Sequence, residues 1–518
     1  MKQRKKISAE KARGAQASRK VALRQLPTGV RGLDDILGGG LPEFSFNIIA
    51  GAPGCGKTTL AHQFVFANAT RQRPALYFTV LGEPALKMLR YQQQYSFFEP
   101  AKVDDTIRFI NLSQVMLEKS LDGVLEEITK QVQESNASIV VVDSFRTVVR
   151  RVLGRGNHEM ELQTFVQNLA LFLASWQATT FLVGEYSEVE MRDNPVFTVA
   201  DGLIWLTQVA ERNSVVRKLQ ITKLRGQESV PGLHTIRITG DGMQAFSRAL
   251  GLGDRKPQPK KRRRLSTGVP ELDKMMGGGI LEGDSLLIAG PSGTGKSALA
   301  TQFIAEGLRH GEPAIAAIFE ERPHGYTMRA DSFGLRLEAA QKNGKLEILY
   351  LRPLDLSVDE TMQSILDAVK RINAKRLVID SLVGFEMALA PGFRVDFRES
   401  LYRMIAALTG AGVTILTTVE IEDSFTSLEL SHYTISFLTD DIVRLRFVEI
   451  DGQLRKIMVV IKMRGGNHSK DIREYVITDK GVVVIHPRHT EYSKLTTGLP
   501  ERADFGESAP EPKAKWRE

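Results

Sequence analysis

Two copies of one phosphate-binding pattern lie 239 residues apart in this chain of 518 residues. Residues 51–58 and 290–297 both fit G-x-x-x-x-G-K-[ST]. The glycines let backbone N–H groups turn toward phosphates, the lysine reaches the β- and γ-phosphates, and the final hydroxyl contacts Mg²⁺. Each copy follows an apolar run and precedes a helical pattern, so we predict a nucleotide site in each half. The predicted nucleotide-binding residues are Gly51, Gly54, Gly56, Lys57, Thr58, Thr59, Gly290, Gly293, Thr294, Gly295, Lys296, Ser297 and Ala298.

The same offset of 239 relates further segments of the two halves. A Thr-Gly-Val at residues 28–30 recurs at 267–269, and a glycine triplet at 38–40 recurs at 277–279. Solenoid repeats have periods of about 20–50 residues, so this one indicates two homologous domains in tandem. Each is long enough to bury its own core. We predict the boundaries as a basic flexible tail at 1–20, a first domain at 21–250, a basic linker at 251–265, a second domain at 266–487 and a disordered tail at 488–518.

The composition indicates a soluble globular protein, with 42% hydrophobic and 25% charged residues. No apolar run reaches the roughly 18 residues that a membrane span needs. The basic N-terminus lacks the apolar region of a secretory signal. A single cysteine, Cys55, rules out a disulfide within the chain and is typical of a reducing cytosol, so we predict a cytoplasmic protein. Cys55 lies inside the first phosphate loop, either as a small tolerated side chain, which we favour, or as a redox-sensitive thiol.

The positive charge is concentrated in two stretches. Residues 1–24 hold nine Lys and Arg against one acidic residue, and residues 254–264 hold seven against one. Such a run can attract nucleic acid or an acidic partner. It is also typical of a mobile, solvated segment, the interpretation that we favour. Neither half shows DNA-binding loops with interleaved aromatic residues, so we do not expect nucleic acid to be the partner.

Apolar strands alternate with helical patterns in both halves. Such alternation predicts an α/β fold with mostly parallel sheets covered on both faces, and ligands then bind at the carboxyl ends of the strands. The first helix after a loop is expected at 60–69. The expected strands are 46–50, 75–80, 139–142 and 179–183 in the first half, and 285–289, 314–319, 376–379 and 413–418 in the second.

Asp143 and Asp380 each end one of these strands and are each followed by serine. A carboxylate there can hold Mg²⁺ opposite the hydroxyl of Thr58 or Ser297, which makes these four residues the predicted metal site. Asp-Ser is also a helix N-cap pattern, but the phosphate loop upstream in each domain favours the metal interpretation.

Glutamates follow the strand beside each loop, and here the halves differ. The second half has the pair Glu320 and Glu321, which can divide the roles of orienting a hydroxyl and accepting its proton. The first half has Leu81 and Gly82 there, and only Glu83 remains to act as the base. Each of these glutamates could instead be a solvent-exposed strand end.

These motifs together resemble the KaiC family, the two-domain RecA-like ATPases and autokinases of the cyanobacterial clock. The resemblance covers nearly all of residues 25–487 and rests on the two loops, the T-G-[VI]-x-x-L-D segments with their glycine triplets, the Asp-Ser pairs, the Glu pair and K-x-R-G. It implies two RecA-like domains in a hexameric double ring with ATP between neighbouring subunits. The Lys and Arg of K-x-R-G, here Lys223 with Arg225 and Lys462 with Arg464, would then reach the γ-phosphate of the next subunit, where a cation stabilises the transferring group. A β-strand with exposed basic residues is the structural alternative.

The resemblance also implies autokinase activity in the second domain, with Glu320 and Glu321 activating an acceptor hydroxyl. Aligned on Thr439, Ser436 falls on the phosphoserine of the family and Ser431 on an upstream threonine that assists. The adjacent phosphothreonine is replaced by phenylalanine, which cannot accept phosphate. A two-site cycle is therefore not expected, whereas phosphorylation of Ser436 alone remains open beside a plain structural role.

We consider three functions. The first is a KaiC-like ATPase with serine/threonine autokinase activity that uses ATP and Mg²⁺ and acts as a timing or signalling hub. The second is a RecA- or RadA-like DNA-dependent ATPase, and the third is a scaffold that ATP assembles with little catalysis. A KaiB-like regulator remains a possible partner, whereas the Pro- and charge-rich tail gives no support for a KaiA-like one.

Overall fold

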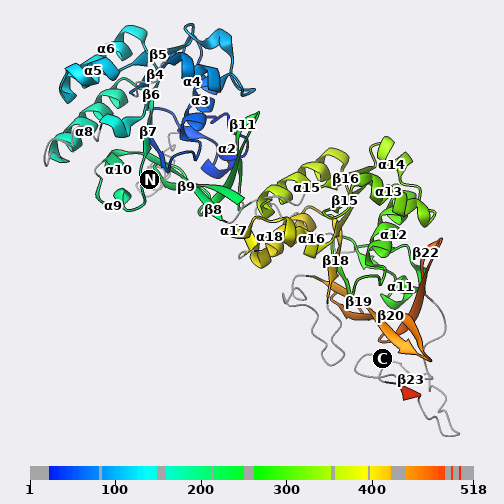
Figure 1. Cartoon of the computed structure of the whole chain (residues 1–518). Helices are drawn as coiled ribbons and strands as arrows, with labels where there is room; N and C mark the ends of the chain where they lie inside the picture. The colour runs from blue at the N-terminus through cyan, green and yellow to red at the C-terminus, as the bar shows by residue number, and fades with distance from the viewer. Residues whose placement is uncertain are drawn as a thin grey trace, which may run out of the picture. The chain divides into compact units, whose positions relative to one another are not determined.

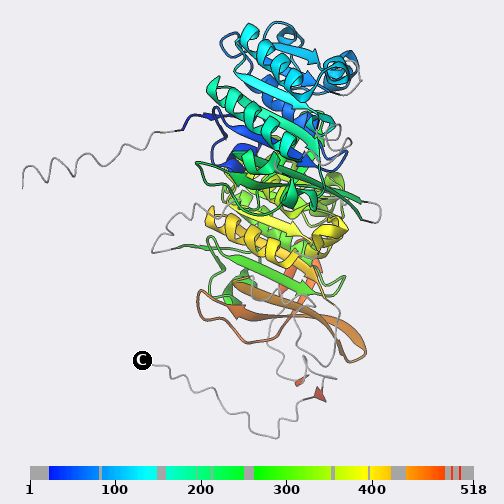
Figure 2. The same ribbon diagram turned by 90° about the vertical axis from the view of Figure 1, so that its left-hand side faces the viewer.

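The computed structural model describes residues 23–80, 85–148, 159–194, 196–211, 214–249, 262–351, 356–394, 397–421, 439–484, 492–493 and 501–502. The chain divides into two compact units, and the main boundary between them lies at residues 248–249. Both have the same architecture, a nine-stranded sheet with helices on both faces (Figures 1 and 2). The predicted α/β class with two tandem RecA-like domains is therefore confirmed.

The first domain builds its sheet in the order β11-β10-β9-β8-β3-β7-β6-β4-β5. The pairs β3–β8, β3–β7, β6–β7, β4–β6 and β4–β5 are parallel, and β9–β10 and β10–β11 are antiparallel. The strands are β3 (Phe46–Gly51), β4 (Ala75–Thr79), β5 (Ile107–Asn111), β6 (Ile139–Asp143), β7 (Thr179–Glu185), β8 (Gly202–Glu211), β9 (Ser214–Leu224), β10 (His234–Thr239) and β11 (Gly242–Phe246), with the short pair β1 (Gln25–Leu26) and β2 (Leu41–Pro42) beside them.

Helices cover both faces of this sheet, which explains why its central strands are continuously apolar. Along β6, Val140 and Val142 face the cluster that contains α6 and α8, whereas Ile139 and Val141 face the cluster around α3. The helices are α2 (Leu33–Leu37), α3 (Lys57–Asn68), α4 (Ala85–Gln92), the 3₁₀ turn η1 (Pro100–Lys102), α5 (Ser113–Glu118), α6 (Leu121–Ser135), α8 (Glu159–Ser175), α9 (Glu190–Asp193) and α10 (Val196–Val199).

The second domain repeats this plan with the order β16-β15-β17-β18-β14-β19-β20-β21-β22. Its strands are β14 (Ser285–Gly290), β15 (Ala314–Ile318), β16 (Leu346–Tyr350), β17 (Arg376–Asp380), β18 (Thr414–Glu420), β19 (Asp441–Ile450), β20 (Gln453–Met463), β21 (Arg473–Thr478) and β22 (Gly481–Val484), with the short pairs β12 (Arg264–Leu265) and β13 (Ile280–Leu281), and β23 (Tyr492–Ser493) and β24 (Glu501–Arg502). Its helices are α11 (Pro270–Met275), α12 (Lys296–Arg309), α13 (Pro323–Ser332), α14 (Glu338–Lys342), α15 (Val358–Ile372), α16 (Leu382–Ala388), α17 (Pro391–Arg394) and α18 (Phe397–Gly410).

The end of the basic linker is held by the second domain through specific ion pairs. Arg262 pairs with Asp284, and Arg263 lies 2.8 Å from Glu312. Arg264 donates to the carbonyls of Met276, Gly279 and Gly465 at 2.7–3.2 Å. The prediction of a solvated run therefore does not hold for Arg262 and Arg264, because a carboxylate and carbonyls take up their hydrogen bonds, whereas the Arg263 side chain is 55% exposed.

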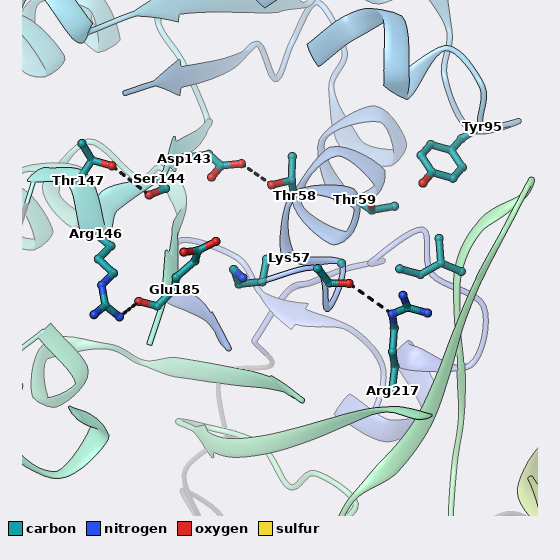
Figure 3. A pocket seen from close by; sticks show the side chains of 13 residues that line it. Lys57, Thr58, Thr59, Tyr95, Asp143, Ser144, Arg146, Thr147, Glu185 and Arg217 are labelled. Atoms are coloured by element: carbon teal, nitrogen blue, oxygen red, sulfur yellow. Dashed lines mark hydrogen bonds between the residues drawn. The ribbon is translucent and has the colours of Figure 1, made fainter. Parts of the chain in front are cut away.

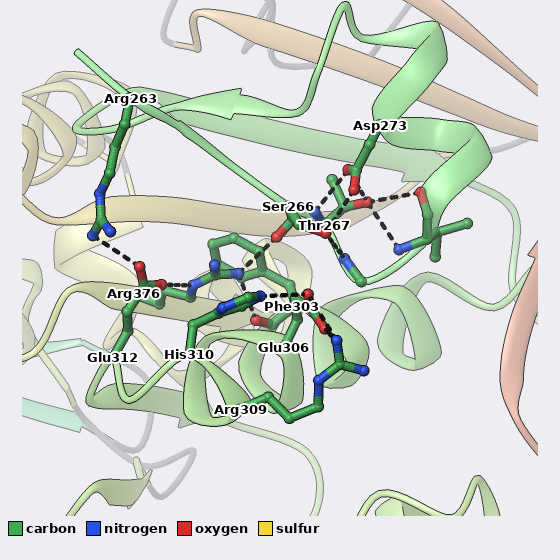
Figure 4. Close-up of polar contacts among 12 residues, drawn as sticks. Arg263, Ser266, Thr267, Asp273, Phe303, Glu306, Arg309, His310, Glu312 and Arg376 are labelled. Atoms are coloured by element: carbon green, nitrogen blue, oxygen red, sulfur yellow. Dashed lines mark hydrogen bonds and ion pairs between the residues drawn. The ribbon is translucent and has the colours of Figure 1, made fainter.

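Glu312 in turn pairs with a buried arginine (Figure 4). Arg376 opens β17, is only 1% exposed, and donates to Glu312 at 2.7 Å. It also donates to the carbonyls of Ser266 and Phe303 at 2.8 and 2.9 Å, and its guanidinium lies 4.5 Å from the Phe303 ring centroid. This cluster fixes the start of the second domain to its central sheet.

None of the helices described is both long enough and apolar enough to cross a bilayer.

Candidate active sites

The first phosphate loop joins the end of β3 to the start of α3, and its glycines hold conformations that other residues rarely adopt. Gly56 caps the helix with φ 101°. At Gly51, with φ 146°, a Cβ would lie 1.9 Å from the carbonyl oxygen of Leu206 on the neighbouring strand. The loop therefore needs glycine to pass close to the sheet and to turn its amides toward the helix N-terminus, where anions are favoured.

Three predicted site residues come together at this loop. Lys57 is 8% exposed, and its ammonium donates to the carbonyl of Ala52 at 2.7 Å. Thr58 Oγ1 donates to Asp143 Oδ2 at 2.8 Å. Asp143 reaches Thr58 because β6 and β3 end at the same edge of the sheet, with β7 between them. A threonine hydroxyl and a carboxylate in contact fit a magnesium ion that is completed by phosphate oxygens.

Tyr77 is a further partner of Asp143 that the sequence did not predict. It is fully buried on β4 and donates its hydroxyl hydrogen to Asp143 Oδ2 at 2.8 Å. Burial raises the pKa of Asp143, and the hydrogen bonds from Tyr77 and Thr58 oppose that rise. His62 stacks on Tyr77 at 4.4 Å between ring centroids, and its Nδ1 lies 2.8 Å from the Thr58 carbonyl oxygen. Burial lowers the pKa of His62 to about 4, so this imidazole is neutral at pH 7.

A cavity of about 620 Å³ opens over this loop (Figure 3). Besides the predicted Gly54, Gly56, Lys57, Thr58, Thr59 and Asp143, its walls include four residues that sequence reasoning missed: Tyr95, Arg146, Glu185 and Arg217. Glu185 carried a usable signal, because it ends an apolar strand as Asp143 does. Arg217 lies within β9 and donates to the Gly54 carbonyl at 3.3 Å, a contact that its sequence context does not reveal.

The second phosphate loop holds its helix cap and its lysine in the same way as the first. Gly295 caps α12 with φ 97°, and Lys296, 9% exposed, donates to the Pro291 carbonyl at 2.8 Å. Thr294 is buried and donates to the same carbonyl at 2.7 Å. Burial lowers the pKa of Lys296, and Glu420, Asp380 and Glu320 act against that change. Ser297 and Ala298 follow Lys296 in the first turn of α12.

The carboxylate at the end of β17 is held differently from its counterpart in the first domain. Asp380 accepts a hydrogen bond of 2.5 Å from Thr418 Oγ1 on β18, and the Arg329 guanidinium lies 3.9 Å away. Position 77 of the first domain corresponds to Ala316 here, which has no hydroxyl. Asp143 therefore contacts a neutral phenol, whereas Asp380 lies near a cation.

The predicted glutamate pair follows β15 and divides between two partners. Glu320 Oε1 accepts a hydrogen bond from Ser381 Oγ at 2.8 Å, directly after Asp380. Glu321 instead accepts from both Nη2 and Nε of Arg329, at 2.8 and 3.2 Å. Of the two glutamates, only Glu321 forms an ion pair among the described residues, and its partner is Arg329. Glu320 is exposed and has no cationic partner among those ion pairs.

The two K-x-R-G segments lie at the ends of β9 and β20 with matching contacts. Lys223 donates to the Thr198 carbonyl at 3.1 Å, and Lys462 donates to the Thr439 carbonyl at 2.6 Å. Arg225 and Arg464 lie 3.3 Å from Asp201 and Asp440, with side chains 62% and 59% exposed. Neither Lys223 nor Arg225 belongs to the described residues that line the cavity over the first loop.

Three predicted site residues, Glu83, Ser431 and Ser436, lie outside the described residues. The predicted tail at 1–20 does as well, together with most of the linker and of the C-terminal tail.

The fold and the two loops define this chain as a tandem P-loop ATPase of the RecA-like class. The sequence model of the KaiC ATPase family matches residues 26–249 and again 265–489. The chain belongs to the KaiC family of ATPases. Three of its relatives bear the name circadian clock oscillator protein KaiC, one of them numbered KaiC 1.

These relatives align over nearly their whole length. The protein of Rippkaea orientalis is 30% identical over 496 residues, which cover 94% of this chain and 93% of the relative. The protein of Prochlorococcus marinus is 29% identical over 504 residues, 96% of this chain and 99% of the relative. KaiC 1 of a Synechocystis species is 29% identical over 496 residues, 94% of each chain. Family membership supports ATPase activity for this chain.

Proposed function

We propose that both domains bind and hydrolyse Mg-ATP in a cytoplasmic homohexameric double ring, and that the second domain also transfers phosphate to Ser436. The observation that carries the proposal is the repeated arrangement at both loops: a P-loop lysine, a hydroxyl at the helix start and an aspartate at the end of a nearby strand. When bound, Mg²⁺ would neutralise charge on the phosphates, and Thr58 with Asp143 and Ser297 with Asp380 would hold it.

The basic pairs favour a site completed by a second subunit. Arg225 and Arg464 are more than half exposed, and their aspartate partners leave most of each guanidinium open. Surface ion pairs of this kind are worth at most about 1 kcal/mol, so a nucleotide phosphate can compete for these cations. Lys223 and Lys462 lie two residues before them. A cation supplied by a neighbour would couple hydrolysis to ring assembly.

The environment of the glutamate pair favours phosphotransfer in the second domain. Glu320 has no cationic partner among the ion pairs of the described residues and contacts Ser381, so it can accept the proton of an acceptor hydroxyl. Glu321 is held by Arg329 and so orients the segment after β15 that also carries Glu320. This assignment makes Glu320 the base and gives Glu321 the supporting role.

Radiolabelled γ-phosphate ATP and mass spectrometry of the intact ring test the kinase part. We expect label on Ser436 in the natural chain, and no label after Ser436→Ala or Glu320→Gln, with ATP still bound. Retention of label after Ser436→Ala would refute the acceptor. ATP turnover without any protein label would leave an ATPase alone, acting as a timing or signalling hub through a partner such as a KaiB-like regulator.

A further inference from the structure

Glu185 presents a carboxylate to the first nucleotide cavity that the glutamate-pair pattern does not explain. It ends β7 and lies in register with Gly51, the first glycine of the loop on β3. It lines the cavity together with Lys57 and Asp143. Figure 3 shows its side chain directed toward these two residues.

The strand end that carries Glu185 is braced by an arginine. Arg146 donates to the Glu185 backbone carbonyl and makes two hydrogen bonds to the Glu190 carboxylate, at 2.7 and 3.0 Å. Glu190 in turn accepts the backbone N–H of Ser187 at 2.8 Å, and the Arg146 guanidinium lies 5.4 Å from the Tyr186 ring centroid. These contacts hold the Glu185 carbonyl and the residues that follow it, and a catalytic group needs a backbone positioned in this way.

This brace occurs in the domain that lacks the glutamate pair. Residues 81 and 82 are Leu and Gly, where the second domain has Glu320 and Glu321. The second domain carries Glu420 in register with Gly290, the first glycine of its own loop. It has no arginine at the position of Arg146, because the residue three positions after Asp380 is Val383. In the domain without the pair, Arg146 therefore braces the strand end that carries the other carboxylate at the cavity.

We propose that Glu185 is the general base for ATP hydrolysis in the first domain. Its carboxylate accepts a proton from water while the water oxygen bonds to the γ-phosphorus. The bond between that phosphorus and the β–γ bridging oxygen breaks, and ADP and phosphate leave. The proton then passes from Glu185 to the released phosphate or to solvent. This assignment rests on the proposed hydrolysis by the first domain and replaces Glu83 as its base.

The test uses the full-length chain with Lys296→Ala, which silences the second site. Glu185→Gln and Glu83→Gln are introduced separately into this parent, and single-turnover ATP hydrolysis is measured beside the Kd for a fluorescent ATP analogue. We expect Glu185→Gln to slow hydrolysis by about 10²–10⁴-fold, the usual contribution of a general base, with Kd changed less than about threefold. Glu83→Gln should lose far less activity than Glu185→Gln does in the same parent.

A matched control is Glu420→Gln in a chain with Lys57→Ala, where the second site keeps its own pair. We expect it to lose far less activity than Glu185→Gln does in the Lys296→Ala parent. Three results would overturn Glu185 as the general base without overturning hydrolysis by the first domain. They are hydrolysis at the parent rate in Glu185→Gln, a large loss of hydrolysis in Glu83→Gln, and equal losses in Glu185→Gln and Glu420→Gln. No turnover in the Lys296→Ala parent would overturn hydrolysis by the first domain, and this assignment with it.

Discussion

Replacing Arg376 by Met tests whether the polar cluster of Figure 4 stabilises the second domain. Methionine keeps an unbranched side chain of similar reach but removes the charge. The change deletes the hydrogen bonds to Glu312 and to the carbonyls of Ser266 and Phe303, and it leaves Glu312, 8% exposed, with Arg263 as its remaining partner in the cluster.

Removing one partner of a buried ion pair lowers the free energy of unfolding by about 3–5 kcal/mol. The reason is that the remaining charge, here Glu312, and the carbonyls that accepted hydrogen bonds from Arg376 stay buried. For a domain of this size each kcal/mol lowers the unfolding midpoint by about 2–4 °C, so the second domain should unfold roughly 6–20 °C lower. The first domain has Ile139 at the start of the corresponding strand and should unfold as before.

Calorimetry of the full chain measures the effect, and we expect one unfolding transition for each of the two compact units. Arg371→Met is the matched control, because Arg371 pairs with Glu347 at the surface, with 57% of its side chain exposed. We expect this control to unfold at the midpoint of the natural chain. Equal midpoints for Arg376→Met and Arg371→Met would refute the reasoning.

Three further predictions address the sites. Arg464→Ala and Lys296→Ala chains should each lose ATP turnover at the second site, and mixing the two should restore part of it. In the mixture the Arg464→Ala chain supplies an intact phosphate loop and the Lys296→Ala chain supplies the arginine. A mixture without recovery would contradict a site shared between subunits. Lowering the pH from 6.5 to 4 should destabilise the first domain by about 3 kcal/mol through His62. The pKa of His62 is about 4 in the folded chain, below its value in the unfolded chain, so mainly the unfolded chain takes up the proton in this window. A His62→Asn chain with the same pH dependence of stability would refute this. Tyr77→Phe should raise the Mg²⁺ concentration for half-maximal nucleotide binding at the first site by about tenfold, since a hydrogen bond to a charged group is worth about 1.5–3 kcal/mol; an unchanged titration would exclude this role.

The parallel half of each sheet could be predicted because its pattern is local. The expected strands at 46–50, 139–142 and 179–183 became β3, β6 and β7, with ends shifted by one or two residues. The antiparallel strands β9–β11 and β20–β22 were not predicted as such. β9 and β20 mix buried, half-buried and exposed residues, which gives a weaker signal than a strand buried on both faces.

Contacts in the candidate sites were predictable where a short motif or the rule on strand ends brings residues to the same edge of the sheet. Thr58 and Asp143 lie 85 positions apart and are in contact, as the strand-end rule predicted. Tyr77 and Arg146 could not be found in this way, because their roles depend on which neighbour their side chains reach across the sheet edge. The division of Glu320 and Glu321 between Ser381 and Arg329 likewise follows from packing.

The number of ATP molecules bound per chain tests the tandem-site account most directly. Equilibrium dialysis with labelled ATP and Mg²⁺ should give two per chain for the natural protein and one for each of Lys57→Ala and Lys296→Ala. A natural chain that binds one ATP or none, or a Lys57→Ala chain that still binds two, would contradict it.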